Sequence, residues 1–435
     1  MTPFPALFVP AELRDAVSDE AWLRAMLEAE AALARAGAGV GLVPDAAARR
    51  IVEACRTHRF APERIAVEGR AVGNPAEPLV RALREAVGPE VADYVHYGAT
   101  SQDIVDTAAM LVSRRALAHV LGALDRLADG CAELARAHRS TPMAARTLLQ
   151  QAVPTTFGLK AAGWLVGTLE AREALERVRS ERLAAQLGGA AGTLAALGEQ
   201  ALEVARRFAS ELGLAEPTLP WHANRQRVAE LGGALAAAAG AAAKVARDIV
   251  LLAQSEIAEV SEGAPGSSST MPHKRNPTRS TLAIACARLA EAHAGALASG
   301  LDHEHERAVG SWHAEWEALS GALAFAGGAA AAAADAVHGL EVDTERMRAN
   351  LASAAQRVTA ERVTLALTPR LGRRRAAAIV AEASRSGRLR DALLADTSVG
   401  LGASELDALL DPTQYLGAAE ALVDRALAEH GGARR

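Results

Sequence analysis

Hydroxyl, amide and cationic groups gather in one short stretch of the chain, residues 261–280, whose sequence is SEGAPGSSSTMPHKRNPTRS. Clusters of serine, glycine and proline without apolar periodicity are usually solvated loops. Here, however, the hydroxyls and backbone amides stand beside Lys274, Arg275 and Asn276. Such donors together can hold a carboxylate, and glycine and serine leave a loop free to close over a ligand. We therefore expect this stretch to bind a ligand that carries carboxylates.

Two further segments contain polar groups suited to the same chemistry. The first, HYGATSQD, places Thr100 and Ser101 just before a long apolar pattern, and the second, ARTLLQ, contains Thr147 and Gln150. A Thr-Ser pair followed by an acidic residue is also the usual signal for the N-terminal cap of a helix. The residues by themselves leave the first segment open between a helix cap and a binding element.

The three segments resemble the signature blocks of the fumarase/aspartase superfamily, in the same order along the chain. The last block of that superfamily has the pattern Gly-Ser-Ser-x-Met-Pro-x-Lys-x-Asn, which this chain matches at Met271, Pro272, Lys274 and Asn276. The alignment makes Ser268 the reactive serine of the pair Ser268 and Ser269. Ser267 stands where the pattern has glycine, so a shift of this assignment by one position stays open.

The resemblance implies a role for each matching residue. Ser268 would transfer a proton, and the carboxylates of the substrate would be bound by Thr100, Ser101, Thr147, Gln150, Lys274 and Asn276. Arg225, in the segment PWHANRQRV, would line the same pocket. His222, in the same segment, fits a pocket residue and a packed histidine near a helix start equally well.

The second block departs from the superfamily pattern at a position that matters for proton transfer. Fumarases and adenylosuccinate lyases carry a histidine where this chain has Leu148. Leucine cannot donate a proton, and the expulsion of an amine or hydroxide needs a donor. A carboxylate, with a pKa of about 4, leaves or adds as an anion without one. We expect Leu148 to lie against an apolar pocket wall, in a site whose leaving or attacking group is already an anion.

Within the superfamily, the bacterial 3-carboxy-cis,cis-muconate cycloisomerases carry out such a reaction. Residues 148–165, 187–199, 220–228 and 304–319 resemble that group. The resemblance implies a cycloisomerase of the β-ketoadipate pathway of protocatechuate breakdown. A carboxylate of the tricarboxylate substrate would add to the diene and form a carboxymuconolactone, with no metal or organic cofactor. An amine lyase of the adenylosuccinate type is the alternative, which Leu148 disfavours. A noncatalytic helical protein is a second alternative, which the intact signature residues disfavour.

Two other clusters of suitable residue types are weaker candidates. The glycine-rich segment at residues 188–192 follows a helical pattern where a dinucleotide-binding loop would follow a strand. His303, Glu304, His305 and Glu306 are metal-ligand types, but adjacent positions on a helix face different directions. For these four residues we expect a solvated helix face or a subunit contact.

The elements that would position these groups are predicted to be long helices. Apolar residues recur at three- and four-residue spacing, without proline, at residues 106–137, 155–186, 230–261, 278–300 and 314–340. Five such stretches predict an all-α protein with a central long-helix bundle at residues 106–341, and the resemblance implies that its fold is of the fumarase/aspartase type. Shorter, proline-broken helices predict two small helical domains beside the bundle, at residues 1–105 and 342–435.

The amino-acid composition favours close packing of helices and disfavours nucleic acid as a partner. Hydrophobic residues make up 50% of the 435-residue chain but aromatic residues only 3%, so alanine, leucine and valine must build the core. Alanine buries little area, and the helices therefore need further partners, which predicts an oligomer. The resemblance implies that this oligomer is a homotetramer with active sites shared between subunits. The net charge of −5, with 47 basic and 52 acidic residues interspersed, disfavours binding of nucleic acid.

Cysteine usage and the apolar segments indicate a cytoplasmic protein. The cysteines, Cys55, Cys131 and Cys286, lie far apart and form no CxxC pair. The N-terminal segment has no basic region followed by a sustained apolar run, so we expect no export signal. Residues 318–334 are uncharged but mostly alanine and glycine, which predicts a buried helix and no membrane span.

Overall fold

The computed structural model describes residues 4–263, 271, 274–385 and 388–433. The chain divides into two compact units, each built from three stretches of sequence. Unit 1 comprises Met1–Asp125, Glu170–Ala243 and Leu282–Ala332, and unit 2 comprises Arg126–Leu169, Lys244–Thr281 and Ala333–Arg435. The predicted division into three domains is a different partition of the chain and stays a prediction.

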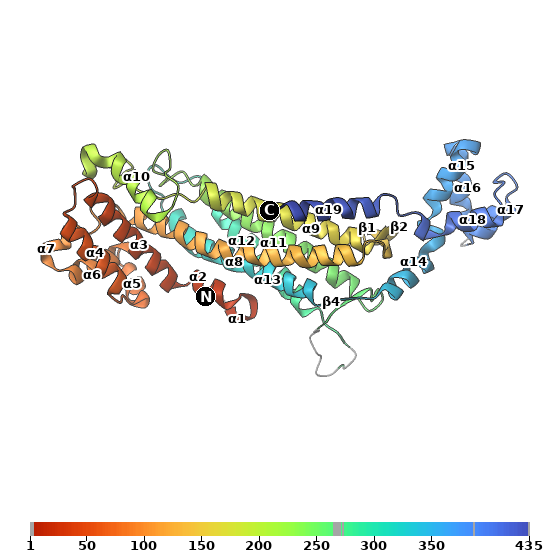
Figure 1. Ribbon diagram of the computed structural model, residues 1–435, viewed down its shortest axis with the longest axis horizontal. Helices are drawn as coiled ribbons and strands as arrows, with labels where there is room; N and C mark the ends of the chain where they lie inside the picture. The colour runs from red at the N-terminus through yellow and green to blue at the C-terminus, as the bar shows by residue number, and fades with distance from the viewer. Residues whose placement is uncertain (1–3, 264–270, 272–273, 386–387, 434–435) are drawn as a thin grey trace. The chain divides into compact units, whose positions relative to one another are not determined.

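The five predicted long helices are all present. They are α8 (Ser101–Ala137), α9 (Phe157–Glu181), α11 (Gln226–Leu252), α12 (Thr278–Ala298) and α13 (Ser311–His338), and each contributes residues to both units. Figure 1 shows their long ribbons. The observed all-α architecture confirms the predicted fold class, and the helix ends fall within about ten residues of those expected from the apolar period.

Helix α13 shows how a core of small side chains is built. Alanine has the highest helix propensity and lets neighbouring backbones approach closely. The helix is long and apolar enough to span a membrane by length and composition, but 78% of its most apolar window is buried inside the protein. A Cβ at Gly328 would lie 2.5 Å from the Phe8 carbonyl oxygen. The segment therefore packs as a core helix, as predicted, and glycine is needed where the chain near Phe8 crosses it.

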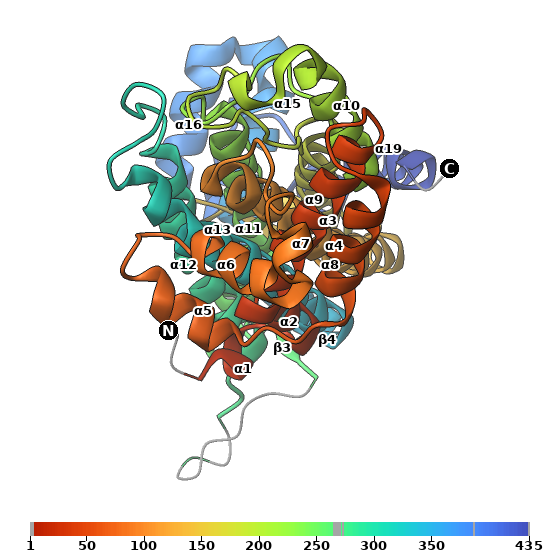
Figure 2. The same cartoon turned by 90° about the vertical axis from the view of Figure 1, so that its left-hand side faces the viewer.

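Unit 1 also contains shorter helices, some of which share a core of their own. They are α1 (Pro5–Phe8), α2 (Ala11–Ala16), α3 (Asp19–Ala38), α4 (Asp45–Thr57), α5 (Pro62–Gly69), α6 (Ala76–Val87), α7 (Pro89–Ala92), the 3-10 helix η1 (Ala195–Gln200) and α10 (Ala201–Leu212). Figures 1 and 2 show α3, α4, α6 and α7 side by side. Ile51, Leu83 and Val95 are among the buried side chains that pack between these helices.

Unit 2 ends in a second group of short helices. They are α14 (Thr344–Val358), α15 (Ala360–Leu371), α16 (Arg373–Arg385), α17 (Leu389–Ala395), α18 (Ala403–Leu410), the 3-10 helix η2 (Pro412–Gln414) and α19 (Ala419–Ala433). Helices α15 to α18, in blue in Figure 1, enclose a core that includes Val363, Leu367 and Leu406.

Two short antiparallel sheets of two strands each, in unit 2, were not predicted. Strand β1 (Pro142–Thr147) pairs with β2 (Gln150–Thr156), and β3 (Val260–Glu262) pairs with β4 (Leu340–Val342). The helix expected to continue to residue 261 therefore ends at Leu252. The strands are short and carry little alternation of apolar and polar residues, so the periodicity argument had no signal to detect.

Candidate active site

The turn that leads into α8 is held by the first residues of the helix itself. The Thr100 amide donates to Oδ2 of Asp103 at 2.9 Å, which is one of the two hydrogen bonds of a capping box at a helix N-terminus. Gly98 has a φ of 75°, and a Cβ there would lie 2.4 Å from a Leu197 methyl carbon. The structure thus confirms the capping interpretation of this segment. The amides that begin a helix lack intrahelical acceptors, so Thr100 and Ser101 stand where an anion binds favourably.

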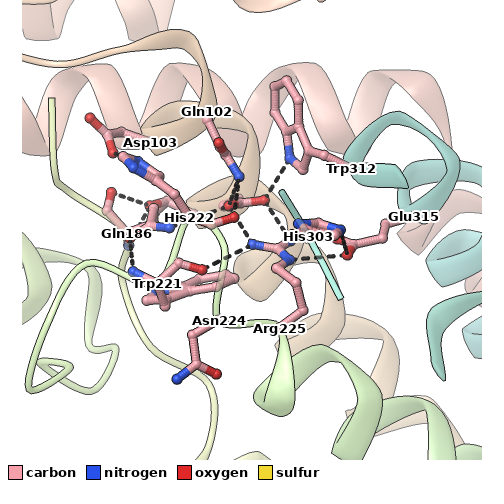
Figure 3. Close-up of polar contacts among 12 residues, drawn as sticks. Gln102, Asp103, Gln186, Trp221, His222, Asn224, Arg225, His303, Trp312 and Glu315 are labelled. Carbon is pink, nitrogen blue, oxygen red and sulfur yellow. Dashed lines mark hydrogen bonds and ion pairs between the residues drawn. The ribbon is translucent and has the colours of Figure 1, made fainter. Parts of the chain in front are cut away.

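Asp103 joins three separate segments of unit 1 at this point. Its side chain is fully buried, and besides Thr100 it accepts from the Gly188 and Gly189 amides at 2.9 Å each. Nε2 of His222 lies 2.7 Å from its Oδ1. Figure 3 shows the imidazole beside the carboxylate. His222 is therefore a packed histidine, and the glycine-rich segment is a turn around a carboxylate of the protein.

Arg225 lies in a buried network of charges next to this cluster (Figure 3). Its guanidinium donates to both oxygens of Asp106, at 2.8 and 3.0 Å, and to both oxygens of Glu315. The Trp221 carbonyl and the Trp312 indole complete the network. Burial lowers the pKa of Arg225, but the two carboxylates outweigh it and raise the pKa above its ordinary value. The predicted contact of Arg225 with substrate stays a prediction, and the geometry favours a structural role.

Replacing Arg225 with methionine should therefore cost stability. The change leaves Asp106 and Glu315 buried without a cation, a loss of about 3–5 kcal/mol in the free energy of unfolding. Burial already raises the pKa of Glu315. A carboxyl with a raised folded-state pKa destabilises the protein as pH rises, so the deficit should shrink as pH falls toward that pKa. Chemical unfolding at several pH values measures both effects.

The exposed pair of Arg182 and Glu230 supplies the control for this variant. Arg182→Met should cost no more than about 1 kcal/mol, because solvent screens a surface ion pair. Equal losses for Arg182→Met and Arg225→Met would contradict the structural role of the buried network.

The His303 cluster differs from what the sequence suggested. The segment forms the loop between α12 and α13, so the expected helix face does not exist. The His303 side chain is fully buried, with Nε2 3.3 Å from Oε1 of Glu315, and its pKa is lowered by burial and by Arg225. Glu304 and His305 are exposed, as expected. Among the residues that the structure describes, no group of three or more His, Cys, Asp or Glu side chains is placed to hold a metal ion.

Arg307 is a cation near Thr100 and Ser101 that was not predicted from the sequence. Arg307, half-buried in the loop before α13, donates from Nε to Oε1 of Gln102 at 3.4 Å and from Nη2 to the Ala190 carbonyl at 3.0 Å. Gln102 directly follows Ser101, so this guanidinium lies beside the start of α8. Arg307 belongs to a segment that already resembled the cycloisomerases, but nothing in its spacing related it to residue 102.

The second signature segment forms the tip of the hairpin of β1 and β2 in unit 2. Thr147 and Gln150 are paired across the turn, and both are exposed. The two turn residues, Leu148 and Leu149, have φ values of 50° and 64° and are 96% and 70% exposed. Such φ values suit a two-residue hairpin turn but are unusual for leucine. The expected apolar wall against Leu148 is thus not formed in this unit, and its side chain projects into solvent.

The third segment is described only at residues 261–263, 271 and 274–280, and Ser268 lies outside the described residues. The Lys274 amide donates to the Met271 carbonyl at 3.0 Å, and Asn276 lies just before α12. Buried Glu262 accepts from the Ser280 amide at 2.9 Å and fixes the start of α12. Thr100, Ser101 and Arg225 thus belong to unit 1, whereas Thr147, Gln150, Lys274 and Asn276 belong to unit 2.

Comparison with known proteins agrees with the motifs. Residues 10–289 match the family model described as lyase, and residues 357–426 match the adenylosuccinate lyase C-terminus. A nitrosuccinate lyase of Streptomyces davaonensis is 47% identical, with 95% of this chain and 91% of that protein covered. A 3-carboxy-cis,cis-muconate cycloisomerase of Pseudomonas aeruginosa is 46% identical, with 98% and 96% covered.

A solved structure shows the same fold over the whole chain. The crystal structure of a 3-carboxy-cis,cis-muconate lactonizing enzyme from Pseudomonas putida superimposes with a TM-score of 0.92 at 41% identity, and each chain is covered completely. The family model matches well over half of this chain, and the relatives match nearly all of it. The predicted superfamily is therefore confirmed, and the chain belongs to the lyase family, with a C-terminal segment of the adenylosuccinate lyase type.

Proposed function

We propose that this chain is a cycloisomerase that converts 3-carboxy-cis,cis-muconate to a carboxymuconolactone in the β-ketoadipate pathway. The observation that carries the proposal is Leu148, which stands where the lyases have a proton-donating histidine. A carboxylate that adds to a diene is already an anion at neutral pH and needs no group to remove its proton. The 46% identity to a cycloisomerase over 98% of the chain supports the same reaction.

In the proposed reaction, one carboxylate of the substrate attacks the conjugated diene. Negative charge then accumulates as an enolate-like dianion on another carboxylate of the substrate. Hydrogen bonds and positive charge stabilise that dianion in the transition state. Lys274, Asn276, Thr100, Ser101, Thr147 and Gln150 hold the carboxylates of the substrate from the ground state onward and supply this stabilisation. Ser268 delivers the proton to carbon and so completes the reaction. The proposed reaction needs no metal or organic cofactor.

Elimination of nitrite from nitrosuccinate is a second candidate reaction. The relative that is a nitrosuccinate lyase is 47% identical to this chain. Nitrite leaves as a stable anion, so this reaction also proceeds without a proton donor at position 148. Release of an amine from adenylosuccinate does need a donor, and the alternative of an adenylosuccinate-type lyase is therefore disfavoured.

A direct assay of three substrates separates these functions. We expect loss of diene absorbance with 3-carboxy-cis,cis-muconate. Nitrosuccinate should give little nitrite, and adenylosuccinate should give no measurable fumarate. Efficient release of nitrite, with no effect on the diene, would replace the proposed function with the second candidate.

We further propose a cytoplasmic homotetramer in which the signature segments of different subunits meet at shared sites. Leu148 and Leu149 support this assembly, because two large apolar side chains exposed at a hairpin tip gain from burial against another subunit. Light scattering on the purified protein should give a mass about four times that of the 45.1 kDa chain. A fully active monomer would contradict both the assembly and the shared sites.

A further inference from the structure

The carboxylate of Asp103 is completely occupied by donors of the protein. Oδ1 accepts from the Gly188 amide at 2.9 Å and from Nε2 of His222 at 2.7 Å. Oδ2 accepts from the Thr100 and Gly189 amides at 2.9 Å each. A carboxylate offers about four such acceptor positions. Asp103 is thus saturated by four donors and is not available to a ligand.

The close packing of His222 against Gly188 is an independent sign that this arrangement is specific. A Cβ at Gly188 would lie 2.8 Å from Cε1 of His222 and 2.8 Å from Cβ of Pro220. Real Cβ atoms do not approach so closely, so alanine at this position would displace the imidazole or the turn. Glycine at position 188 lets the ring reach the carboxylate.

The groups held by Asp103 adjoin those assigned to the substrate. The Thr100 amide donates to Asp103 and is therefore not available to a ligand. The side chains of Thr100 and Ser101 are only half-buried and can reach one. The backbone amides of the first residues of α8 come directly after Thr100 in the chain and are further donors at the same place. A bound carboxylate needs these donors at fixed positions, because a loose turn would have to be ordered at each binding event.

We propose that Asp103 and His222 are positioning residues, which fix the Thr100–Ser101 turn against the Gly188–Gly189 turn so that the start of α8 is preorganised for one carboxylate of the substrate. The proposal deepens the proposed function and rests on it for the identity of the substrate. Neither residue touches the reacting atoms. Both act through the geometry of the donors at Thr100 and Ser101.

Two variants of His222 distinguish positioning from simple packing. His222→Met keeps the bulk but removes the N–H, and KM should rise at least about tenfold while kcat changes by less than about threefold. The effect falls on KM because the carboxylate is bound in the ground state as well as in the transition state. His222→Gln restores an N–H at similar reach and should bring KM back to within about fivefold of wild type.

Asp103→Asn and Gly188→Ala disturb the same contacts by changing the partners of His222. In Asp103→Asn an NH2 group replaces one carboxylate oxygen and faces the two N–H groups that donated to that oxygen. Donors then oppose donors, so KM should rise more than in His222→Met. In Gly188→Ala the imidazole is displaced, and KM should rise to a similar extent as in His222→Met. The matched control is Gly233→Ala, since a Cβ at this exposed position in α11 meets nothing within 4 Å. That variant should leave KM, kcat and assembly unchanged.

Calorimetric binding of tricarballylate, a saturated tricarboxylate, keeps this test separate from that of the proposed function. If wild-type protein fails to consume 3-carboxy-cis,cis-muconate, the proposed function is wrong, but the Kd for tricarballylate still reports on the carboxylate site. We expect His222→Met and Gly188→Ala to raise that Kd at least about tenfold at unchanged light-scattering mass. Unchanged KM and Kd in folded variants, or no binding to the wild-type protein, would overturn the positioning role.

Discussion

Ser268→Ala is expected to lower kcat by about 10²–10⁴ and to leave KM largely unchanged. A proton donor acts in the transition state and contributes little to the binding of the ground state, so its loss falls on kcat. The alignment on Lys274 and Asn276 selects this serine among its neighbours. Steady-state kinetics with 3-carboxy-cis,cis-muconate measures both constants.

Ser267→Ala and Ser269→Ala are the matched controls, because all three variants remove one hydroxyl from the same segment. Both controls should keep most of the activity. If Ser268→Ala stays near wild-type activity and one of the neighbours does not, the alignment is shifted by one position. If all three variants remain active, a serine of this segment is not the proton donor.

The sequence predicted the long helices well because their signal is local and repeated. Helix α12 starts at Thr278, as expected, and α8 ends at Ala137, as expected. The hairpin at Leu148 was missed because its turn uses two leucines with positive φ, whereas the recognisable two-residue turns use asparagine, aspartate or glycine. That turn is set by its surroundings and not by the preference of its own residues.

Contacts across long sequence separations limited what could be predicted of the site. Asp103 was recognised as part of a helix cap, but its bonds to Gly188 and His222 join segments 85 and 119 residues away. Arg225 and Glu315 are 90 residues apart, so nothing local revealed that this arginine has two buried acidic partners. His303 was expected on a solvated helix face or at a subunit contact, yet its side chain is buried and extends from a loop.

Leu148→His tests the most specific chemical claim of the proposed function. Position 148 lies at an exposed turn with a φ of 50°, a region that histidine adopts more readily than leucine. The turn itself therefore accommodates the substitution. Leu148→Asn is the control, because it suits the turn and places a polar side chain at the same proposed subunit contact but cannot act as an acid or base. Far-ultraviolet circular dichroism and light scattering check both variants before any assay.

With 3-carboxy-cis,cis-muconate, Leu148→His should not be faster than wild type and is expected to be slower. The attacking carboxylate carries no proton for the imidazole to remove, and a hydrogen bond from the ring would weaken the carboxylate as a nucleophile. A clear gain in kcat/KM for Leu148→His over both wild type and Leu148→Asn would show that lactonisation does use a base here.

The wild-type protein should also release no measurable fumarate from adenylosuccinate or argininosuccinate. The nitrogen leaving groups of these substrates need a proton, and the absence of one well-placed acid costs about 10²–10⁴ in rate. Leu148 is the reason that acid is absent, since the histidine of the lyases would occupy its position. Efficient release of fumarate from either substrate would mean that another residue supplies the proton. The argument from Leu148 to a carboxylate nucleophile would then fail, even if the protein also consumed the muconate.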